Sequence, residues 1–341
     1  MHVPDGFLDV PTSLATGVVA AGAIAVALKK SRSELNEKAA PMAGLTAAFV
    51  FAAQMINFPV GVGTSGHLMG GALAAVLVGP WTAVLVVSVV MMVQALVFAD
   101  GGLTALGTNI TLIGLVTVLV GWSVTKLVLA VLPKRPASVV PASFVGALLS
   151  VPAAAAVFVL LYSVGGATEL PFGALMATML GWHTIIGLGE AFITAATVGA
   201  VVAVRPDLVY AARGMSQHLV LRTPDGQEIP ATAVEVADEP RRSIWPLAVG
   251  GLGVTLVIAG ALSFFASSNP DGLEYVAEDQ GFIAAAEDSA VAGWSLADYG
   301  EVGGIPVGVA GLIGVGITIL IGLVLFQLIA RRDRDRDSVS A

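Results

Sequence analysis

The chain has 341 residues, of which 56% are hydrophobic and only 12% charged, with 40 glycines and no cysteine. Soluble domains carry roughly a quarter charged residues, so this composition predicts a polytopic membrane protein whose glycine-rich helices pack closely in lipid. The lack of cysteine excludes disulfides and thiolate metal sites. The net charge of −8 says little about nucleic acid, because the charges are confined to loops and a tail; no nucleic-acid partner is expected.

The chain begins Met1-His2-Val3-Pro4-Asp5, and His2 is the most informative of these residues. The terminal amine, the amide nitrogen of His2 and its imidazole can close two fused chelate rings around one metal ion. Three nitrogens in one plane suit Ni(II), Cu(II) or low-spin Co(II). No basic region precedes the first apolar run, so we expect no cleavable signal peptide and a retained Met1. The alternative is that His2 is an ordinary residue of a frayed terminus.

Apolar runs along the chain predict an all-α membrane protein with nine spans: a bundle of about seven helices followed by two more. A helix needs about 20 residues to cross the hydrocarbon core. The run 68–79 is shorter than this and ends at Gly79-Pro80, so we expect a kinked or partly re-entrant segment. In chain order the runs cover 12–28, 39–58, 68–79, 80–99, 103–132, 137–162, 172–204, 245–266 and 304–330.

The basic residues predict how the chain is oriented. All 16 Lys and Arg residues lie at or after the ends of the first, fifth, seventh and ninth runs. The loops on the opposite side, 1–11, 60–67, 100–102, 163–171 and 267–303, contain none. Because cytoplasmic loops carry the excess of Lys and Arg, we expect the N-terminus outside and the C-terminus in the cytoplasm.

Composition also divides the chain into parts. Residues 1–215 form the dense hydrophobic domain, and 216–244 are predicted to be a polar cytoplasmic linker. Residues 245–330 contain two apolar runs around an acidic loop on the outer side, and 331–341 form a charged cytoplasmic tail of alternating sign.

A second histidine is predicted on the same side of the membrane as His2. His67 follows the glycine-rich stretch 61–66 at the mouth of a span. Neutral imidazole is the commonest metal ligand in proteins, and a fourth nitrogen would complete a square plane. The alternative is a polar residue at a helix start, but two outer histidines beside a chelating terminus favour a metal site.

Several other polar residues lie within apolar runs. His183 and Glu190, seven residues apart, share one helix face and are predicted either to form a buried pair, which we favour, or to line an inward path. Metal-bound imidazoles usually donate their other ring nitrogen to an oxygen, and Gln54, Asp100 and Asn109 are candidates for that supporting role. The alternative for these residues is hydrogen bonding between helices.

Five separated motifs carry a family resemblance: residues 1–8, 63–75, 79–81, 94–109 and 183–191. Together they resemble the CbiM/NikM family, the substrate-binding membrane components (S components) of energy-coupling-factor (ECF) importers for cobalt and nickel. The resemblance covers roughly residues 1–215. Asn269-Pro270-Asp271-Gly272-Leu273-Glu274 resembles the PDGLE domain, a two-span module related in role to the accessory CbiN/NikN subunits.

The resemblance implies a ligand set made of the Met1 amine, the His2 amide and imidazole, and His67. It implies Ni(II) or Co(II) as the transported substrate, no organic cofactor, and a location in a bacterial or archaeal cell membrane. The implied partners are a CbiQ/NikQ-like coupling protein and CbiO/NikO-like ATPases. Since no phosphate-binding loop occurs in this sequence, ATP hydrolysis is expected in those partners and the chain is not expected to be an enzyme.

Two other functions are compatible with parts of the sequence. A proton-coupled secondary transporter of transition metal ions would use His183 and Glu190 as a relay. A membrane metalloenzyme is disfavoured, because the His-Glu-x-x-His pattern is absent. The ligand types do not separate nickel from cobalt.

Overall fold

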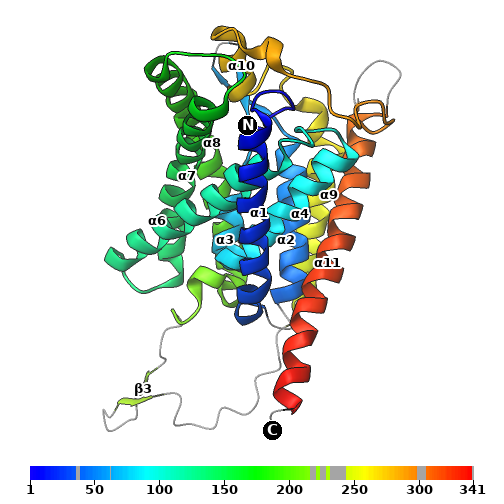
Figure 1. Cartoon of the computed structure of the whole chain (residues 1–341). Helices are drawn as coiled ribbons and strands as arrows, with labels where there is room; N and C mark the ends of the chain where they lie inside the picture. Colours follow the sequence, from blue (N-terminus) through cyan, green and yellow to red (C-terminus); the bar gives the residue numbers. More distant parts are fainter. Residues whose placement is uncertain are drawn as a thin grey trace.

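The computed structural model describes residues 1–35, 39–61, 63–215, 220–222, 228–230, 243–297 and 305–339, so most of the expected linker lies outside the described residues. The chain forms a bundle of helices along one long axis (Figure 1). Its helices are α1 (Val10–Lys30), α2 (Ala39–Gln54), α3 (Gly71–Val78), α4 (Pro80–Val97), α5 (Leu106–Asn109), α6 (Thr117–Val131), α7 (Val139–Gly165), α8 (Phe172–Val204), α9 (Trp245–Gly260), α10 (Gly272–Asp279) and α11 (Val307–Val339).

Short strands and one π-helix complete the fold. The antiparallel pair β1 (Phe58–Gly61) and β2 (Thr64–Gly66) lies near the N-terminus, and the pair β3 (Val220–Arg222) and β4 (Glu228–Pro230) belongs to the expected linker. The π-helix Ile110–Val116 joins α5 to α6.

All nine apolar runs form helices, but within the described part of the chain only six helices are long and apolar enough to cross a membrane. Two others, α2 and α9, are apolar but have 16 residues each, and α3 has eight. The all-α polytopic membrane fold is therefore confirmed. The nine full-length spans are not, because α2, α3 and α9 are too short to count as spans.

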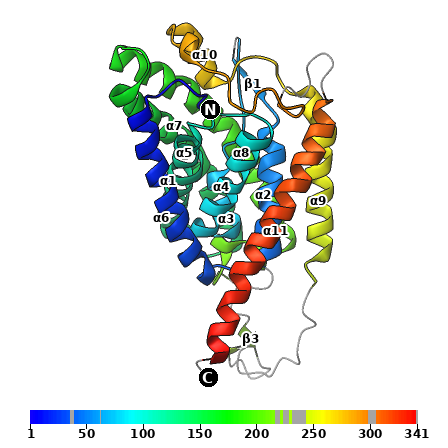
Figure 2. The same cartoon turned by 45° about the vertical axis from the view of Figure 1, so that its right-hand side comes forward.

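The two ends of the chain lie at opposite ends of the bundle (Figures 1 and 2). The N-terminus, α10 and the β1–β2 hairpin share one end, here called the N-terminal end. Basic residues mark the other end, since Lys29 and Lys30 end α1 and Arg205 follows α8. This separation agrees with the predicted one-sided distribution of charge.

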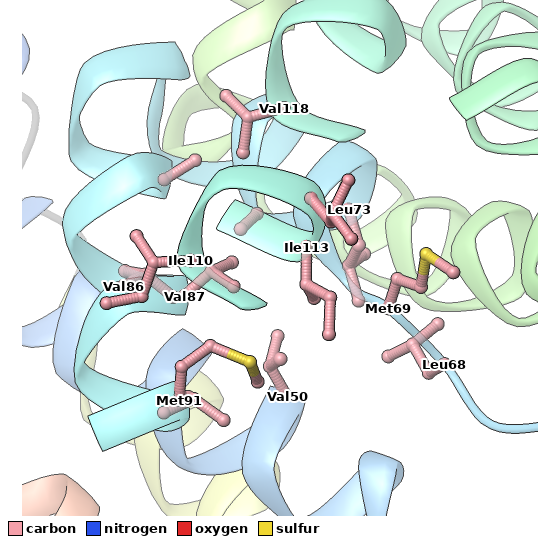
Figure 3. Packing of buried hydrophobic residues seen from close by; sticks show 14 of the residues in the cluster. Val50, Leu68, Met69, Leu73, Val86, Val87, Met91, Ile110, Ile113 and Val118 are labelled. Atoms are coloured by element: carbon pink, nitrogen blue, oxygen red, sulfur yellow. The ribbon is translucent and has the colours of Figure 1, made fainter. Parts of the chain in front are cut away.

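The helices of residues 245–330, here called the second module, pack on the first domain, residues 1–215. Helices α9 and α11 lie side by side against α2 (Figure 2). At the centre, α3 packs against α4, α6 and α7. Figure 3 shows the apolar packing around it, where Val50 of α2, Leu73 of α3, Val87 of α4 and Ile113 of the π-helix are completely buried.

The short helix α3 begins inside the bundle, after a non-helical segment, residues 67–70. Such backbone is tolerated at membrane depth only if its polar groups are hydrogen-bonded. Both carboxylate oxygens of Glu190 accept hydrogen bonds here, from the amides of Met69 (2.7 Å) and Gly70 (3.1 Å). Gln54 Nε2 donates to the carbonyl of Met69 at 2.9 Å. These two buried side chains thus satisfy the backbone that leads into the eight-residue helix α3.

The expected pair between His183 and Glu190 is not formed. His183 Nδ1 instead donates to the carbonyl of Met179 at 2.8 Å, and Glu190 accepts from the backbone just before α3. The reason is geometric: seven residues of α-helix span about 10.5 Å, so two side chains on one face at that spacing meet only by reaching far along the axis.

We predict that Glu190→Ala lowers the free energy of unfolding by about 1 to 3 kcal/mol, because two buried amides lose their side-chain acceptor. SDS titration of the protein in micelles, followed by circular dichroism, measures this. Glu169→Ala is the control, since Glu169 is exposed in the loop before α8. Equal stability of the two variants would contradict the assigned role of Glu190.

Candidate metal centre

The first residues of the chain are buried inside the N-terminal end of the bundle. Val3 is completely buried, and Met1 is only 3% exposed. Asn109 brackets Val3 from both sides: its Oδ1 accepts from the Val3 amide at 2.8 Å, and its Nδ2 donates to the Val3 carbonyl at 3.0 Å. The amide of Gly102 donates to the same carbonyl at 3.0 Å. Asn109 therefore positions the segment that carries His2.

Asp5 provides a second anchor that the sequence did not single out. Its carboxylate accepts hydrogen bonds from the amides of Leu103 (3.1 Å) and Thr104 (2.7 Å) and from the Thr104 hydroxyl. Its carbonyl accepts from the amide of Glu287 at 2.9 Å, so the second module also holds this segment. An aspartate followed by glycine after proline resembles an ordinary turn, which explains why its role was not recognised.

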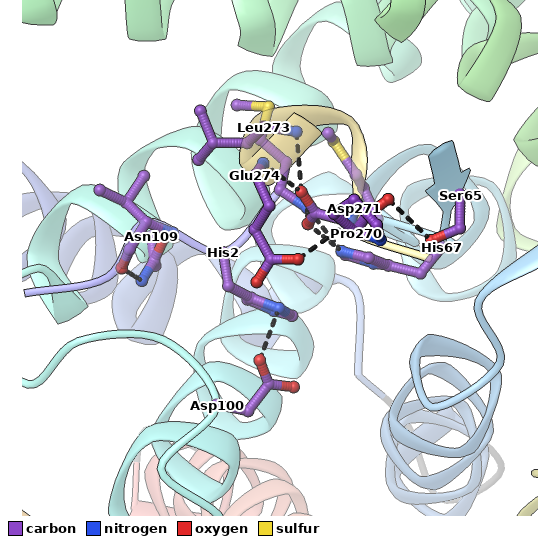
Figure 4. A network of polar contacts seen from close by, with 12 residues as sticks. His2, Ser65, His67, Asp100, Asn109, Pro270, Asp271, Leu273 and Glu274 are labelled. Atoms are coloured by element: carbon purple, nitrogen blue, oxygen red, sulfur yellow. Dashed lines mark hydrogen bonds and ion pairs between the residues drawn. The ribbon is translucent and has the colours of Figure 1, made fainter. Parts of the chain in front are cut away.

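The terminal amine meets His67. The nitrogen of Met1 lies 2.5 Å from His67 Nε2, and the imidazole rings of His2 and His67 are nearly parallel with centroids 4.9 Å apart (Figure 4). Metal–nitrogen bonds are about 2.0 Å long at zinc, so two such bonds at a right angle place their nitrogens about 2.8 Å apart. The amine and His67 thus have nearly the spacing of two neighbouring ligands of one ion.

The surroundings of His67 keep its imidazole neutral. Burial lowers the pKa of His67, and the nearby terminal ammonium lowers it further. Its Nδ1 lies 3.0 Å from the carbonyl of Leu68 and donates to it in the tautomer that leaves the lone pair on Nε2. A neutral imidazole whose second nitrogen bonds a carbonyl is the usual form of a metal-binding histidine.

His2 is held by Asp100 rather than left free. Its Nδ1 lies 3.0 Å from Asp100 Oδ1, and its Nε2 is buried without a hydrogen-bond partner among the described residues. Burial alone would raise the pKa of Asp100, but His2 outweighs this effect and keeps the pKa below its ordinary value. Ala99, immediately before, has φ = 53°, a strained conformation outside glycine that fixes the turn presenting Asp100.

One acidic residue at this site was not expected there. Asp271, in the second module, contacts both the Met1 nitrogen (2.5 Å) and His67 Nε2 (3.5 Å) through its Oδ2. Burial alone would raise the pKa of Asp271, but the terminal ammonium holds it well below its usual range. The only sequence signal was its place in the PDGLE-like motif, which says nothing of contact with the N-terminus.

A cavity of about 340 Å³ lies at this site, and His2, His67, Asp100 and Asp271 are among the residues that line it. Of the residues expected at a site, the structure brings Met1, His2, His67, Asp100 and Asn109 together at the N-terminal end. Gln54 lines the same cavity. Glu190 does not line it but accepts a hydrogen bond from Met69, two residues after His67, and His183 packs against Gly272. Within the described residues no three His, Cys, Asp or Glu side chains form a metal-holding group by themselves, so a four-nitrogen site would depend on backbone nitrogens.

The fold and this site define a polytopic membrane protein with a buried, nitrogen-rich polar site at one end. The chain belongs to the CbiM family, the cobalt uptake substrate-specific transmembrane region, whose model matches residues 2–208. A PDGLE domain matches residues 245–331. The protein is therefore a member of a family of cobalt and nickel transport components, with a PDGLE domain fused after the CbiM region.

The relatives described here each match about three fifths of this chain. A putative metal transport protein of Haloquadratum walsbyi is 38% identical over 210 residues, which are 62% of this chain and 94% of the relative. A putative fused nickel transport protein of Archaeoglobus fulgidus is 36% identical over 61% of this chain and 68% of the relative. A crystal structure of a transition metal transporter matches with a TM-score of 0.51 and 30% identity, covering 60% of this chain and 93% of that one.

We predict that Asn109→Ala loosens the N-terminal segment. Losing a buried hydrogen-bond partner costs about 1 to 3 kcal/mol, which corresponds to roughly ten- to hundredfold faster amide exchange at Val3. Hydrogen–deuterium exchange with mass spectrometry of the N-terminal peptide measures this. Asn57→Ala, at another residue lining the cavity, is the control. Unchanged exchange in Asn109→Ala would show that other contacts suffice.

Proposed function

We propose that this chain is the substrate-specificity component of an ATP-driven ECF importer for Ni(II) or Co(II). The metal is captured by four nitrogens: the Met1 amine, the His2 amide, the His2 imidazole and His67 Nε2. The observation that carries this proposal is the 2.5 Å approach of the Met1 nitrogen to His67 Nε2, with His2 beside them. Family membership supports the class of substrate.

Metal binding rearranges the protons and one hydrogen bond of this site. The amine and the amide must each lose a proton before they bind a metal, whereas the imidazole of His67 is already neutral. Fused chelate rings through the amide require the Nδ1 atom of His2, so the metal takes the place of Asp100 on that nitrogen. Asn109, which brackets Val3, holds the neighbouring backbone during this exchange.

The proposed direction of transport follows from charge. The site lies at the end of the bundle that is opposite the basic residues Lys29, Lys30 and Arg205. The positive-inside rule makes the basic end cytoplasmic, so the N-terminal end faces outward, where the metal arrives. Release to the cytoplasm requires a change of the bundle, and a CbiQ/NikQ-like coupling protein with CbiO/NikO-like ATPases would drive it.

A proton-coupled mechanism receives no support from the residues that suggested it. Both oxygens of Glu190 accept hydrogen bonds from the backbone at the start of α3. His183 lies two turns away on α8 and bonds within its own helix. The two side chains therefore form no direct hydrogen bond with each other.

We predict that a Gly-Pro dipeptide added before Met1 lowers nickel affinity at least a hundredfold, because the ligand amine becomes an amide and the added proline has no amide proton with which the new terminus could chelate the ion. His2→Ala and His67→Ala should each have a comparable effect. Isothermal titration of the untagged protein with Ni(II) and Co(II) measures the affinities. The controls are a glycine added after Ala341 and His218→Ala, at a histidine outside the described residues. Tight nickel binding by the N-terminally extended protein would refute the proposed ligand set.

The energy source is tested separately. In sealed vesicles that contain only this chain, we expect metal binding but no sustained uptake. Uptake should appear when the coupling protein and ATPases are added with ATP, and an uncoupler should not abolish it. Uptake by the chain alone that collapses with an uncoupler would establish the secondary-transport alternative.

A further inference from the structure

The second module reaches the candidate metal centre with a single carboxylate. Asp271 is buried, with 8% of its surface exposed, and lies at the start of α10. Its Oδ2 is 2.5 Å from the Met1 nitrogen and 3.5 Å from His67 Nε2 (Figure 4). The carboxylate thus contacts two nitrogens of the proposed ligand set, although it belongs to a different domain.

The other carboxylate oxygen of Asp271 caps the N-terminus of α10. Its Oδ1 accepts hydrogen bonds from the amides of Leu273 (2.7 Å) and Glu274 (3.0 Å), and the Glu274 carboxylate accepts from the Asp271 amide at 3.0 Å. This reciprocal arrangement is a capping box, which fixes the orientation of the carboxylate. Oδ2 is consequently aimed at the site by α10 itself.

Backbone contacts also fix Asp271 relative to His67. The amide of Ser65 donates to the carbonyl of Pro270 at 2.9 Å, and the Ser65 hydroxyl donates to the carbonyl of Asn269 at 2.8 Å. Ser65 lies in β2, two residues before His67. The segment that presents Asp271 and the loop that presents His67 therefore form one hydrogen-bonded unit.

We infer that Asp271 is a positioning residue for metal capture: its carboxylate holds the terminal amine against His67 and supplies the counter-charge of the bound ion. This inference rests on the proposed function. A divalent ion held by an amine, one deprotonated amide and two neutral imidazoles carries a net charge of +1. A buried charge is costly without a partner, and Asp271 supplies the negative charge beside it. The PDGLE domain thereby takes part in substrate binding.

Two substitutions separate this role from simple helix capping. Asparagine caps a helix as well as aspartate does, but it lacks the charge. Glutamate keeps the charge but is a poorer cap. We expect Asp271→Asn to lower nickel affinity about ten- to hundredfold, the usual effect of losing a group that supports metal ligands. Asp271→Glu should retain most of the affinity. Unchanged affinity in Asp271→Asn, or an equal loss in both variants, would overturn the inference.

A second measurement requires no metal. In the full-length metal-free protein, an amine-reactive reagent should label Met1 faster in Asp271→Asn than in the unaltered chain, because the amine has lost its carboxylate. Glu278→Gln, at an exposed acid of the same helix, is the matched control and should label at the unaltered rate. Equal labelling in all three proteins would count against Asp271. Failure of the unaltered chain to bind nickel would refute the proposed function instead, while the labelling result would still test Asp271.

Discussion

The structure depends on the hydrogen bonding of two non-helical backbone segments that enter a helix bundle. One is the N-terminal segment, and the other is the loop from β2 to α3. Neither can satisfy its own amides and carbonyls as a helix does, and lipid offers no partners. Asn109 and Asp5 satisfy the first segment, and Glu190 and Gln54 satisfy the second. Buried polar side chains, which are costly in a membrane, thus lie where backbone amides and carbonyls lack hydrogen-bond partners of their own.

The proposed site follows from the meeting of these two segments. The first segment carries the Met1 amine and His2, and the second carries His67. Because both are fixed by buried hydrogen bonds, the nitrogen of Met1 and Nε2 of His67 lie 2.5 Å apart before any metal is considered. Preorganisation of this kind reduces the entropy that binding must overcome. A flexible terminus would not provide it.

The second module contacts both segments at the N-terminal end of the bundle. Its strand-like contact with Ser65, its backbone bond to Asp5 and its carboxylate at Met1 all fall within one short stretch, residues 269–287. Aromatic packing adds to this, since the ring of Phe282 contacts both Phe7 and Tyr162 with centroids about 5 Å apart. A fused domain of this kind keeps its contacts at high effective concentration, which a separate subunit does not.

Composition and hydropathy were sufficient to predict a helical membrane protein, and the family motifs were sufficient to indicate a metal transport component. The chelating potential of Met1 and His2 was also visible, because it depends only on covalent connectivity. The pairing of His183 with Glu190 was wrong, since a shared helix face says nothing of which backbone lies opposite. The sequence likewise did not show where α3 begins. The apolar run starts at residue 68, but the helix starts only at Gly71, after a non-helical segment.

The sequence by itself therefore determined the class, the helices and the local chemistry of the terminus. Only the tertiary structure decided that Asp5 anchors this terminus, that Glu190 binds the backbone before α3, and that Asp271 of a distant domain reaches the amine. The physical reason is that local patterns record periodicity and covalent spacing. The partners of a buried polar group lie up to 270 residues away and are chosen by packing.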